Sequence, residues 1–370
     1  MHVVHVSKIK GIAGSERHLL TLLPGLARRG VEPLMLMLEE PGHPADNFAA
    51  EMAACGVRVL REPIRGHLDA SLGRRLAAHF RTLRPEIVHT HLVHADLYGL
   101  PAARRAGVPV AISSRHNDNP FRRNPLLAAA NRCAMRRADR VIAISEALAG
   151  FVRDVERIPA GKVITIRYGM HAPAETALTR AEARAALGIV GEGPLIGFFG
   201  RLIPQKGVDV LLRAFAALGE AHPTPRLVIV GDGGERAALE ALAAHLGLAE
   251  RVTFAGWQAE ASRLMPAADV IVMPSRWEGF GLVALEAMAA ARPLVASRVS
   301  ALPEIVVDGV TGRLVPPDDA AALAVALDGL LGEPAFAAAL GAAGRARLET
   351  DFAAETMVER TLDLYRTLAE

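Results

Sequence analysis

Short runs of apolar residues alternate with longer segments of helical periodicity along almost the whole 370-residue chain. The runs are continuous and do not alternate with polar residues, which is typical of parallel strands covered on both faces. The predicted strands span residues 2–6, 33–38, 57–60, 86–90, 109–113, 140–144, 162–166, 194–199, 226–230, 251–255, 269–273 and 293–297. The predicted helices span residues 15–29, 70–83, 94–106, 124–137, 146–155, 207–221, 235–247, 260–266 and 281–291. This order predicts an α/β fold.

A break in the pattern near 171–193 divides the chain. No strand is predicted there, and the break contains the cluster Pro173, Gly188, Gly191, Gly193 and Pro194. The length also suits two domains, so we predict two doubly wound lobes over 1–175 and 188–350. The last stretch, 319–370, contains three helical patterns and no further strand. Ligands of such sheets bind beyond the carboxyl ends of strands, so residues directly after strands are the candidates for chemistry.

Composition narrows the class of protein. The chain is 51% hydrophobic and 22% charged, which excludes a disordered chain. Aromatic residues make up only 4%, which argues against a nucleic-acid partner that stacks its bases. Two cysteines fit a reducing compartment, and neither a signal peptide nor a run of about 20 apolar residues is present. We therefore expect a cytoplasmic protein without a nucleic-acid partner.

The net charge of +2 conceals an asymmetry between the lobes. Residues 1–187 carry 27 Lys and Arg against 17 Asp and Glu, a charge of +10, so the remainder carries −8. A predicted basic helix near 122–140 contains Arg122, Arg123, Arg132, Arg136 and Arg137. It suits contact with anionic membrane lipid or with a polyprenyl-phosphate-linked acceptor, and an ordinary solvated face is the alternative.

The segment from Pro274 to Glu286 follows one predicted strand and opens the next helix. Gly281 permits a tight turn, and the free amides from Gly281 onward form a helix N-terminus that suits an anion. Glu278 precedes this helix and Glu286 lies one turn beyond Leu282. The pair suits hydroxyl groups on either side of a bound phosphate, although two solvated glutamates of an ordinary loop give the same pattern.

A second candidate segment, Gly200 to Gly207, opens the second lobe. Arg201 follows a predicted strand and Lys206, the only lysine of the second lobe, begins the next helix. A guanidinium and an ammonium group together suit a diphosphate. An exposed basic turn is the alternative interpretation.

Histidines in the first lobe allow two interpretations. His89, His91 and His94 are closely spaced, as metal ligands are, but they lie across a strand end and the loop that follows it, so we favour a site without metal. His116 follows a strand and is either a structural histidine or part of the site.

These segments together resemble the family-4 (group 1) retaining glycosyltransferases of the GT-B fold. The second-lobe resemblance rests on Glu278 and Glu286 with seven residues between them, and on Gly200-Arg201, Lys206-Gly207 and Val230-Gly231-Asp232-Gly233. In the first lobe the similar segments are 11–16 (a glycine-rich loop after the first strand), 87–91, 113–116 and 142–145. A final helix near 353–369 resembles the family's helix that crosses back to the first lobe, and the likeness covers essentially the whole chain.

The resemblance implies a role for each matching residue. Arg201 and Lys206 would bind the donor diphosphate with the amides of Gly281 and Leu282, and Glu286 would bind the ribose hydroxyls. Glu278 and His116 would lie near the transferred sugar. The implied catalytic set is His116, Glu278, Arg201 and Lys206, and the implied donor-binding set is Gly14, Arg201, Lys206, Glu278, Phe280, Gly281, Leu282 and Glu286. Two positions depart from the family: Tyr168-Gly169 replaces its usual Asn-Gly, and Ala13-Gly14 replaces its double glycine.

The expected reaction is transfer of a sugar with retention from a UDP-sugar or GDP-mannose to a glycan or lipid-linked acceptor, in polysaccharide or glycoconjugate synthesis at the cell surface. No metal or other cofactor is expected, because Arg201 and Lys206 supply the positive charge. The expected location is the cytoplasm, with peripheral contact at the inner face of the cytoplasmic membrane. The alternatives are a GT-B nucleotide-sugar epimerase, a phosphorylase with lysine-bound pyridoxal phosphate, and a non-catalytic binding protein with two lobes. A dinucleotide oxidoreductase is disfavoured, because no G-x-G-x-x-G follows the first strand.

Overall fold

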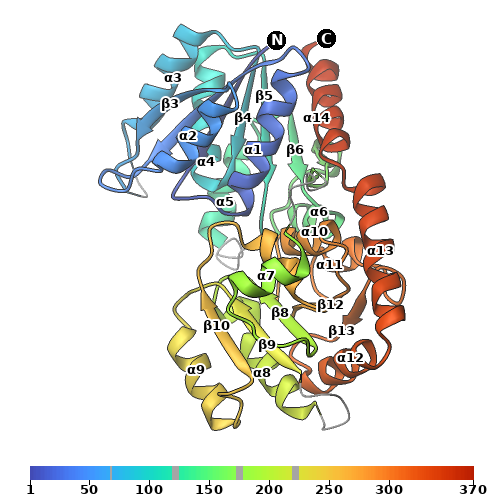
Figure 1. The fold of residues 1–370 in the computed structure, drawn as a ribbon. Coiled ribbons are helices and arrows are strands. Elements are labelled where there is room, and N and C mark those ends of the chain that lie inside the picture. Colours follow the sequence, from blue (N-terminus) through green and yellow to red (C-terminus); the bar gives the residue numbers. More distant parts are fainter. Residues whose placement is uncertain (67–68, 119–124, 172–177, 219–224) are drawn as a thin grey trace. The chain divides into compact units, whose positions relative to one another are not determined.

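Two parallel sheets organise the computed structural model, which describes residues 1–66, 69–118, 125–171, 178–218 and 225–370 (Figure 1). The chain divides into two compact units, Met1–His171 with Ala353–Glu370, and Ala172–Phe352. The predicted bounds of 1–175 and 188–350 left the segment between them unassigned, and it falls in the second unit.

The first unit contains a seven-stranded sheet of order β3-β2-β1-β4-β5-β6-β7. Its strands are β1 (His2–Lys8), β2 (Glu32–Glu39), β3 (Arg58–Pro63), β4 (Ile87–His91), β5 (Val110–Arg115), β6 (Arg140–Ala143) and β7 (Val163–Thr165). Its helices are α1 (Gly14–Ala27), α2 (Asp46–Ala54), α3 (Leu72–Leu83), α4 (Leu92–Ala106), α5 (Pro125–Met135), α6 (Glu146–Asp154), the 3-10 turn η2 (Ala160–Lys162) and the final helix α14 (Ala354–Ala369). All the strand pairs are parallel, as the continuous apolar runs predict.

The second unit repeats the design with a six-stranded sheet of order β10-β9-β8-β11-β12-β13. Its strands are β8 (Leu195–Phe199), β9 (Arg226–Val230), β10 (Val252–Gly256), β11 (Val270–Met273), β12 (Leu294–Ser297) and β13 (Arg313–Val315). Its helices are α7 (Arg180–Ala186), α8 (Val208–Ala217), α9 (Arg236–His245), α10 (Leu282–Ala289), α11 (Leu302–Ile305), α12 (Ala320–Gly332) and α13 (Pro334–Asp351), with the 3-10 turns η3 (Pro204–Lys206) and η4 (Ala261–Ala267). Its core joins apolar side chains of the sheet to those of α8, α9 and α12.

The strand order reverses once in each sheet, between β1 and β4 in the first unit and between β8 and β11 in the second. The crossover connections leave these two neighbours in opposite directions, which opens a crevice at their carboxyl ends. Residues directly after β1, β4, β8 and β11 are therefore the best placed to bind ligands.

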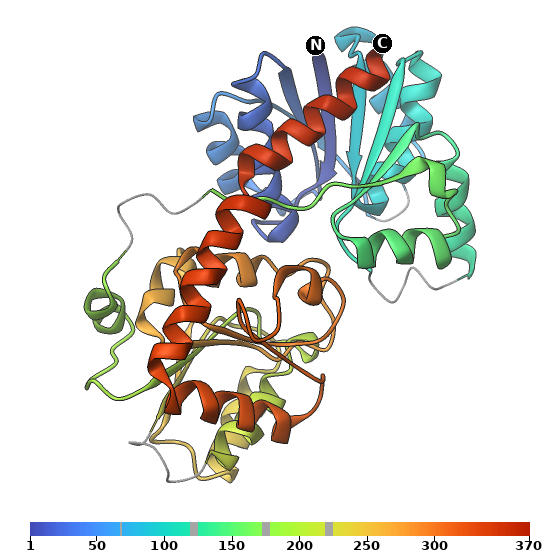
Figure 2. The same ribbon diagram turned by 90° about the vertical axis from the view of Figure 1, so that its right-hand side faces the viewer.

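The final helix α14 belongs to the first unit. It lies over one face of the sheet and packs against α1 (Figure 2). Close packing of α1 and α14 needs Gly25, because a Cβ there would lie 2.5 Å from a methyl carbon of Val358. Gly169 is equally confined, since its Cβ would lie 2.5 Å from the carbonyl oxygen of Ala353. The helix expected near 353–369 is thus present, and it packs on the first sheet.

Several elements differ from the sequence-based expectations. The predicted helix 260–266 is instead the 3-10 segment η4, which contains Pro266 and so lacks one amide donor. The short elements α2, α7, α11 and β13 are not predicted, because none spans more than nine residues or shows strong periodicity. For α7 a signal was present, since Thr179 and Glu182 form a capping box at its start.

No single helix among the described residues is long and apolar enough to cross a membrane. One bent pair, α12 with α13, passes that test by length and composition only, with a bend of 103° between the two helices.

Candidate active site

The two strands at the reversal of the second sheet carry the candidate donor-binding residues. Gly200 and Arg201 directly follow β8, and the loop 274–281 directly follows β11. Lys206 ends the 3-10 turn η3, and α8 begins at Val208. The expectation that Lys206 begins a helix is therefore wrong, because a short 3-10 turn precedes the helix. The predicted residues therefore border the crevice where an open α/β sheet binds its ligand.

Lys206 and Glu278 meet directly in the second unit. The ammonium Nζ of Lys206 lies 2.5 Å from Oε1 of Glu278, and both side chains are mostly shielded from solvent. Ser275 donates its hydroxyl to the same carboxylate oxygen at 2.7 Å, and the backbone amide of Glu278 donates to Oγ of Ser300 at 3.2 Å. Three contacts thus fix the carboxylate and its backbone before any ligand arrives. Ser275 and Ser300 were missed by sequence reasoning, because serines in a loop carry no distinctive pattern.

Arg201 contrasts with Lys206. Its side chain is exposed, and within the described part of the chain its guanidinium group has no hydrogen-bond or ion-pair partner. An exposed cation without a protein partner, directly after a strand of the reversal, is expected where an anionic ligand supplies the missing partner.

Arg276 braces the two loops of this crevice. It donates to Asp318 at 2.7 Å, to Asp209 at 2.8 Å and to the carbonyl oxygen of Pro204 at 2.6 Å. Its own amide donates to the carbonyl oxygen of Gln205 at 2.8 Å. Arg276 therefore ties the η3 turn that carries Lys206 to the loop that carries Glu278, and it is a functional residue that the sequence analysis missed.

Helix α10 starts at the expected place. Its N-cap, Gly281, has φ +103°, and a Cβ there would lie 2.8 Å from a methyl carbon of Leu302. Only glycine meets both demands without strain. Leu282 and Glu286 are half-buried on the first turns of the helix. Phe280 is buried, with its ring edge-on to that of Phe352 at 6.3 Å between ring centres, so its side chain serves packing.

In the first unit Gly14 is the exposed first residue of α1, directly after the loop that follows β1. Glu16 in the first turn is buried, and its Oε2 accepts hydrogen bonds from the amide of Ala13 at 3.1 Å and the hydroxyl of Ser15 at 3.0 Å. Burial raises the pKa of Glu16, and these hydrogen bonds oppose the rise.

His116 lies at the carboxyl end of β5 and is buried. Its Nε2 is 3.0 Å from Nδ1 of His91, and its Nδ1 bonds to the hydroxyl of Tyr168. Both ring nitrogens thus have partners within the first unit. Arg115, the residue before it, is also buried and binds Asp96 and Glu156, which fixes this strand end.

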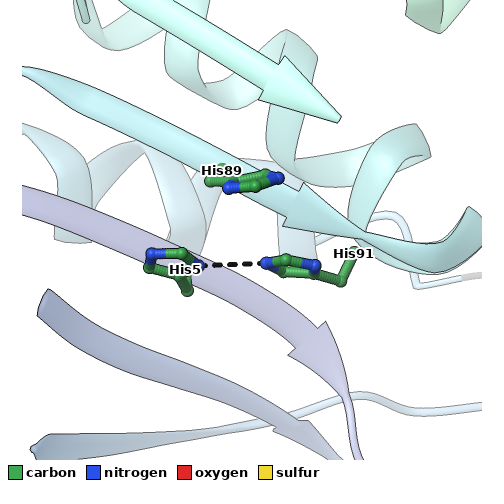
Figure 3. Close-up of side chains that lie close together, drawn as sticks. All are labelled: His5, His89 and His91. Atoms are coloured by element: carbon green, nitrogen blue, oxygen red, sulfur yellow. Dashed lines mark hydrogen bonds between the residues drawn. The ribbon is translucent and has the colours of Figure 1, made fainter. Parts of the chain in front are cut away.

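The closely spaced histidines converge, but with a different third member than the sequence suggested. His5, His89 and His91 place ligand-type nitrogen atoms within 4.8 Å of one another (Figure 3), whereas His94 lies on α4 outside this group. His5 was missed because only the pairing of β1 with β4, which sets His5 opposite His89, reveals it. Burial lowers the pKa of His5 to about 3 and lowers those of His89 and His91 well below the usual value.

In the basic helix near 122–140, Arg122 and Arg123 lie outside the described residues. Arg136 and Arg137 are exposed at the end of α5, and Arg132 is half-buried.

Two family models match the chain and divide it as the fold does. "Glycosyltransferase Family 4" matches residues 12–171, and "Glycosyl transferases group 1" matches residues 179–347. The alpha-D-kanosaminyltransferase of Streptomyces kanamyceticus is 31% identical over 350 residues, which cover 86% of this chain and 90% of that protein. The chain belongs to the group 1 glycosyltransferases.

Other relatives of this group 1 glycosyltransferase carry related names. The GDP-mannose-dependent alpha-(1-6)-phosphatidylinositol monomannoside mannosyltransferase of Mycolicibacterium smegmatis is 33% identical, over 81% of this chain and 82% of that protein. The D-inositol 3-phosphate glycosyltransferase of Mycobacterium sp. (strain KMS) is 36% identical over 66% of this chain, which spans 59% of that protein.

Solved structures confirm the GT-B fold. Anabaena HepE in complex with UDP aligns with a TM-score of 0.86 over 99% of this chain and 100% of that one, at 22% identity. The sucrose-phosphate synthase of Thermosynechococcus elongatus aligns with a TM-score of 0.82 over 99% and 98% of the two chains, at 26% identity. The group 1 glycosyltransferase is thus a two-lobe α/β enzyme that uses a nucleotide-sugar donor, and the epimerase, phosphorylase and binding-protein alternatives are not favoured.

Two adjacent glycines of the glycosyltransferase give a matched test of the crevice. A Cβ on Gly233 would lie 2.3 Å from the carbonyl oxygen of Leu202, whereas a Cβ on Gly234 would meet nothing within 4 Å. Gly233→Ala should therefore push apart the loops that follow β8 and β9 and lower the free energy of unfolding by about 2 kcal/mol, the usual cost of overpacking. Gly234→Ala should be neutral.

Denaturant unfolding of the two variants measures this difference. Equal stability of Gly233→Ala and Gly234→Ala would show that the two loops do not approach as closely as described.

Proposed function

We propose that this group 1 glycosyltransferase transfers a sugar, with retention of anomeric configuration, from a UDP-sugar or GDP-mannose donor to a glycan or lipid-linked acceptor. The proposed setting is polysaccharide or glycoconjugate synthesis at the cell surface. The observation that carries the donor half is the placement of exposed Arg201 and of the Lys206–Glu278 pair after the two strands where the second sheet reverses. The family membership carries the reaction type.

The proposed chemistry follows the charge that develops during transfer. Departure of the donor diphosphate concentrates negative charge on phosphate oxygens while the sugar gains oxocarbenium character. Arg201, which lacks a partner among the described residues, and Lys206 stabilise that negative charge, together with the first amides of α10. Because these cations neutralise the leaving group, we propose that the enzyme needs no divalent metal.

Glu278 and Glu286 complete the proposed donor site. Glu278 is fixed by Ser275 and Lys206, so its carboxylate is already oriented to accept hydrogen bonds from sugar hydroxyls. Glu286, one turn into α10, accepts from the ribose hydroxyls. Retention proceeds by front-face substitution, in which the leaving phosphate removes the proton of the acceptor hydroxyl, because no carboxylate in this assignment serves as a nucleophile.

The donor and acceptor classes are supported by relatives. One relative is named for its dependence on GDP-mannose and for a phosphatidylinositol mannoside acceptor, and HepE was crystallised with UDP-glucose. The exposed Arg136 and Arg137 in the basic first unit support peripheral contact with anionic lipid at the inner face of the cytoplasmic membrane.

Transfer assays with a panel of UDP- and GDP-sugars test the proposal, with glycan acceptors and with lipid-linked acceptors in anionic vesicles. Wild-type protein should release nucleotide only when an acceptor is present, and proton NMR of the product should show the anomeric configuration of the donor. Glu278→Ala and Arg201→Ala should each lower the rate by at least about 100-fold.

Arg313→Ala is the matched control, because Arg313 is an exposed arginine at the opposite, amino-terminal end of strand β13 in the same sheet. It should retain full activity. Undiminished transfer by both Glu278→Ala and Arg201→Ala would refute the site, and an inverted product would refute retention. Isomerised donor without acceptor would identify an epimerase instead.

A further inference from the structure

Seven buried polar groups of the first unit form a continuous chain of hydrogen bonds. Following the hydrogen bonds from one group to the next, they are Tyr168, His116, His91, His5, Tyr365, His89 and Ser114. Each group is at most 7% exposed. None of these bonds except those of His116 involves a residue of the sequence-predicted site.

Five of the six links join atoms that lie 2.6 to 3.4 Å apart. Nε2 of His91 is 3.0 Å from Nδ1 of His5, the contact drawn in Figure 3. Nδ1 of His89 is 2.6 Å from the hydroxyl of Tyr365, and its Nε2 is 2.7 Å from the hydroxyl of Ser114. The longest link joins the hydroxyl of Tyr365 to Nε2 of His5 at 3.4 Å. Tyr365 is thus the bridge between the two halves of the chain.

Strand register explains why the groups meet. His5 lies opposite His89, and His91 lies opposite Ser114, so these side chains project from one face of the sheet at β1, β4 and β5. The final helix α14 packs over this face and contributes Tyr365. The chain of hydrogen bonds therefore runs across the carboxyl half of the strands where the first sheet reverses its strand order.

If Tyr365 accepts a hydrogen bond from one of its two neighbouring rings and donates to the other, only two arrangements of donors and acceptors are possible. A neutral imidazole donates from one ring nitrogen and accepts at the other. If Tyr168 donates to His116, every ring in the chain must donate from Nε2 and accept at Nδ1. If instead Ser114 donates to His89, every ring must donate from Nδ1 and accept at Nε2. With Tyr365 in that role, a mixture of tautomers places two hydrogens, or none, in at least one link. A Tyr365 hydroxyl that accepts from both rings leaves its own buried hydrogen without an acceptor in this network, which is costly.

We propose that these seven groups act as a single unit, in which the tautomer of His116 is fixed by Tyr365 on the last helix through His5 and His91. Tyr365, His5 and His91 are then positioning residues that hold His116 in one tautomer and one orientation. The link to transfer rests on the proposed function, together with the place of His116 near the transferred sugar that the family resemblance implies.

The surroundings favour the neutral forms of His5, His89 and His91 and of the two tyrosines. Burial lowers the pKa values of His5, His89 and His91, and it raises those of Tyr168 and Tyr365 well above the usual value. His18 of α1 stacks on Tyr168 at 4.2 Å between ring centres, and burial lowers its pKa as well. Glu16 is the charged neighbour, and its carboxylate contributes to the raised pKa of Tyr168.

A metal ion is the competing occupant of this cluster. His5, His89 and His91 are close enough to share one. However, all six of their ring nitrogens already have a hydrogen-bond partner, so a metal would break the chain at three rings. The hydrogen-bonded chain uses every nitrogen and is the arrangement we favour.

NMR of protein labelled with ¹⁵N in the histidine rings tests the proposal without any activity assay, since the two ring nitrogens have distinct shifts in each tautomer. Single His→Gln variants assign the resonances. At pH 7.5 His5, His89, His91 and His116 should all show the same tautomer. Tyr365→Phe should move the ring resonances of His91 and His116, neither of which Tyr365 bonds to.

Tyr98→Phe is the matched control, because the hydroxyl of Tyr98 accepts a hydrogen bond from the amide of Asp69 and is not one of the seven groups. It should leave the four rings unchanged. In transfer assays Tyr365→Phe should lower kcat about tenfold with little change in the KM of the donor, as expected for a lost orientation, whereas Tyr98→Phe should match wild type.

Mixed tautomers in the wild type, or unmoved His116 resonances in Tyr365→Phe, would overturn the proposal. So would resonances of His5, His89 and His91 that shift together with one equivalent of Zn²⁺ and stay shifted after dialysis. Failure of the proposed function is distinguishable, because it would abolish transfer by the wild type while leaving the NMR result intact.

Discussion

Lys206→Met should lower kcat/KM for the nucleotide-sugar donor about 1000-fold, which corresponds to about 4 kcal/mol of lost transition-state stabilisation. The variant loses the ammonium group that faces the departing diphosphate in the proposed mechanism. It also leaves the buried carboxylate of Glu278 without the cation that lies 2.5 Å from it, so the donor meets an uncompensated negative charge. Steady-state kinetics with the donor identified by the panel measure the effect.

The double variant Lys206→Met/Glu278→Gln separates these two causes. Removing both charges relieves the unpaired carboxylate, so the double variant should unfold with the stability of wild type while remaining inactive. Arg313→Ala, at the other end of the sheet, should keep wild-type kinetics. A Lys206→Met enzyme that retains more than a tenth of the wild-type kcat/KM would show that Lys206 does not face the leaving group.

Acidification from pH 7.5 to 5.5 should lower the free energy of unfolding of the first unit by about 5 kcal/mol. Burial lowers the pKa values of His5 and His18 to about 3 and lowers those of His89 and His91 in the same direction. In the unfolded chain a histidine has a pKa of about 6.5. Below that pH the unfolded chain binds protons that the folded chain does not, so stability falls as the pH falls. At pH 5.5 each such histidine costs about 1.4 kcal/mol.

Guanidinium denaturation followed by circular dichroism at several pH values measures this slope. His18→Phe should reduce the slope of the unfolding free energy against pH by the amount that one bound proton contributes. His18 stacks on Tyr168, and its Nδ1 has no hydrogen-bond partner among the described residues. His43→Asn, at an exposed position, should leave the slope unchanged. A stability that does not change between pH 7.5 and 5.5 would mean that these histidines are not buried as neutral rings.

Sequence patterns predict the sheets of this enzyme well for a physical reason. Strands such as β8 and β11 are buried on both faces, so each reads as an unbroken apolar run, and the residues directly after them are readily identified as candidates. Arg201, Lys206, Glu278 and Gly281 lie in the segments that follow these two strands, at the reversal of strand order, although Lys206 ends a 3-10 turn and does not begin the helix.

The parts that could not be predicted depend on contacts between distant segments. Arg276 acts through partners 42 to 72 residues away, and nothing in its immediate sequence distinguishes it from the other arginines of the chain. His5 and Tyr365 are 360 residues apart and meet only because α14 packs over β1. The sequence does show that His5, His89 and His91 are polar residues within otherwise apolar strands, but which of them meet depends on the pairing of β1 with β4.

Calorimetric titration of UDP and GDP into the purified protein tests most directly whether the donor diphosphate binds at the reversal of the second sheet. We predict that one of the two nucleotides binds at one site per chain, that Arg201→Ala weakens its binding at least about tenfold, and that Arg313→Ala leaves it unchanged. Equal affinity of Arg201→Ala and wild type for that nucleotide would contradict the assignment of the donor site.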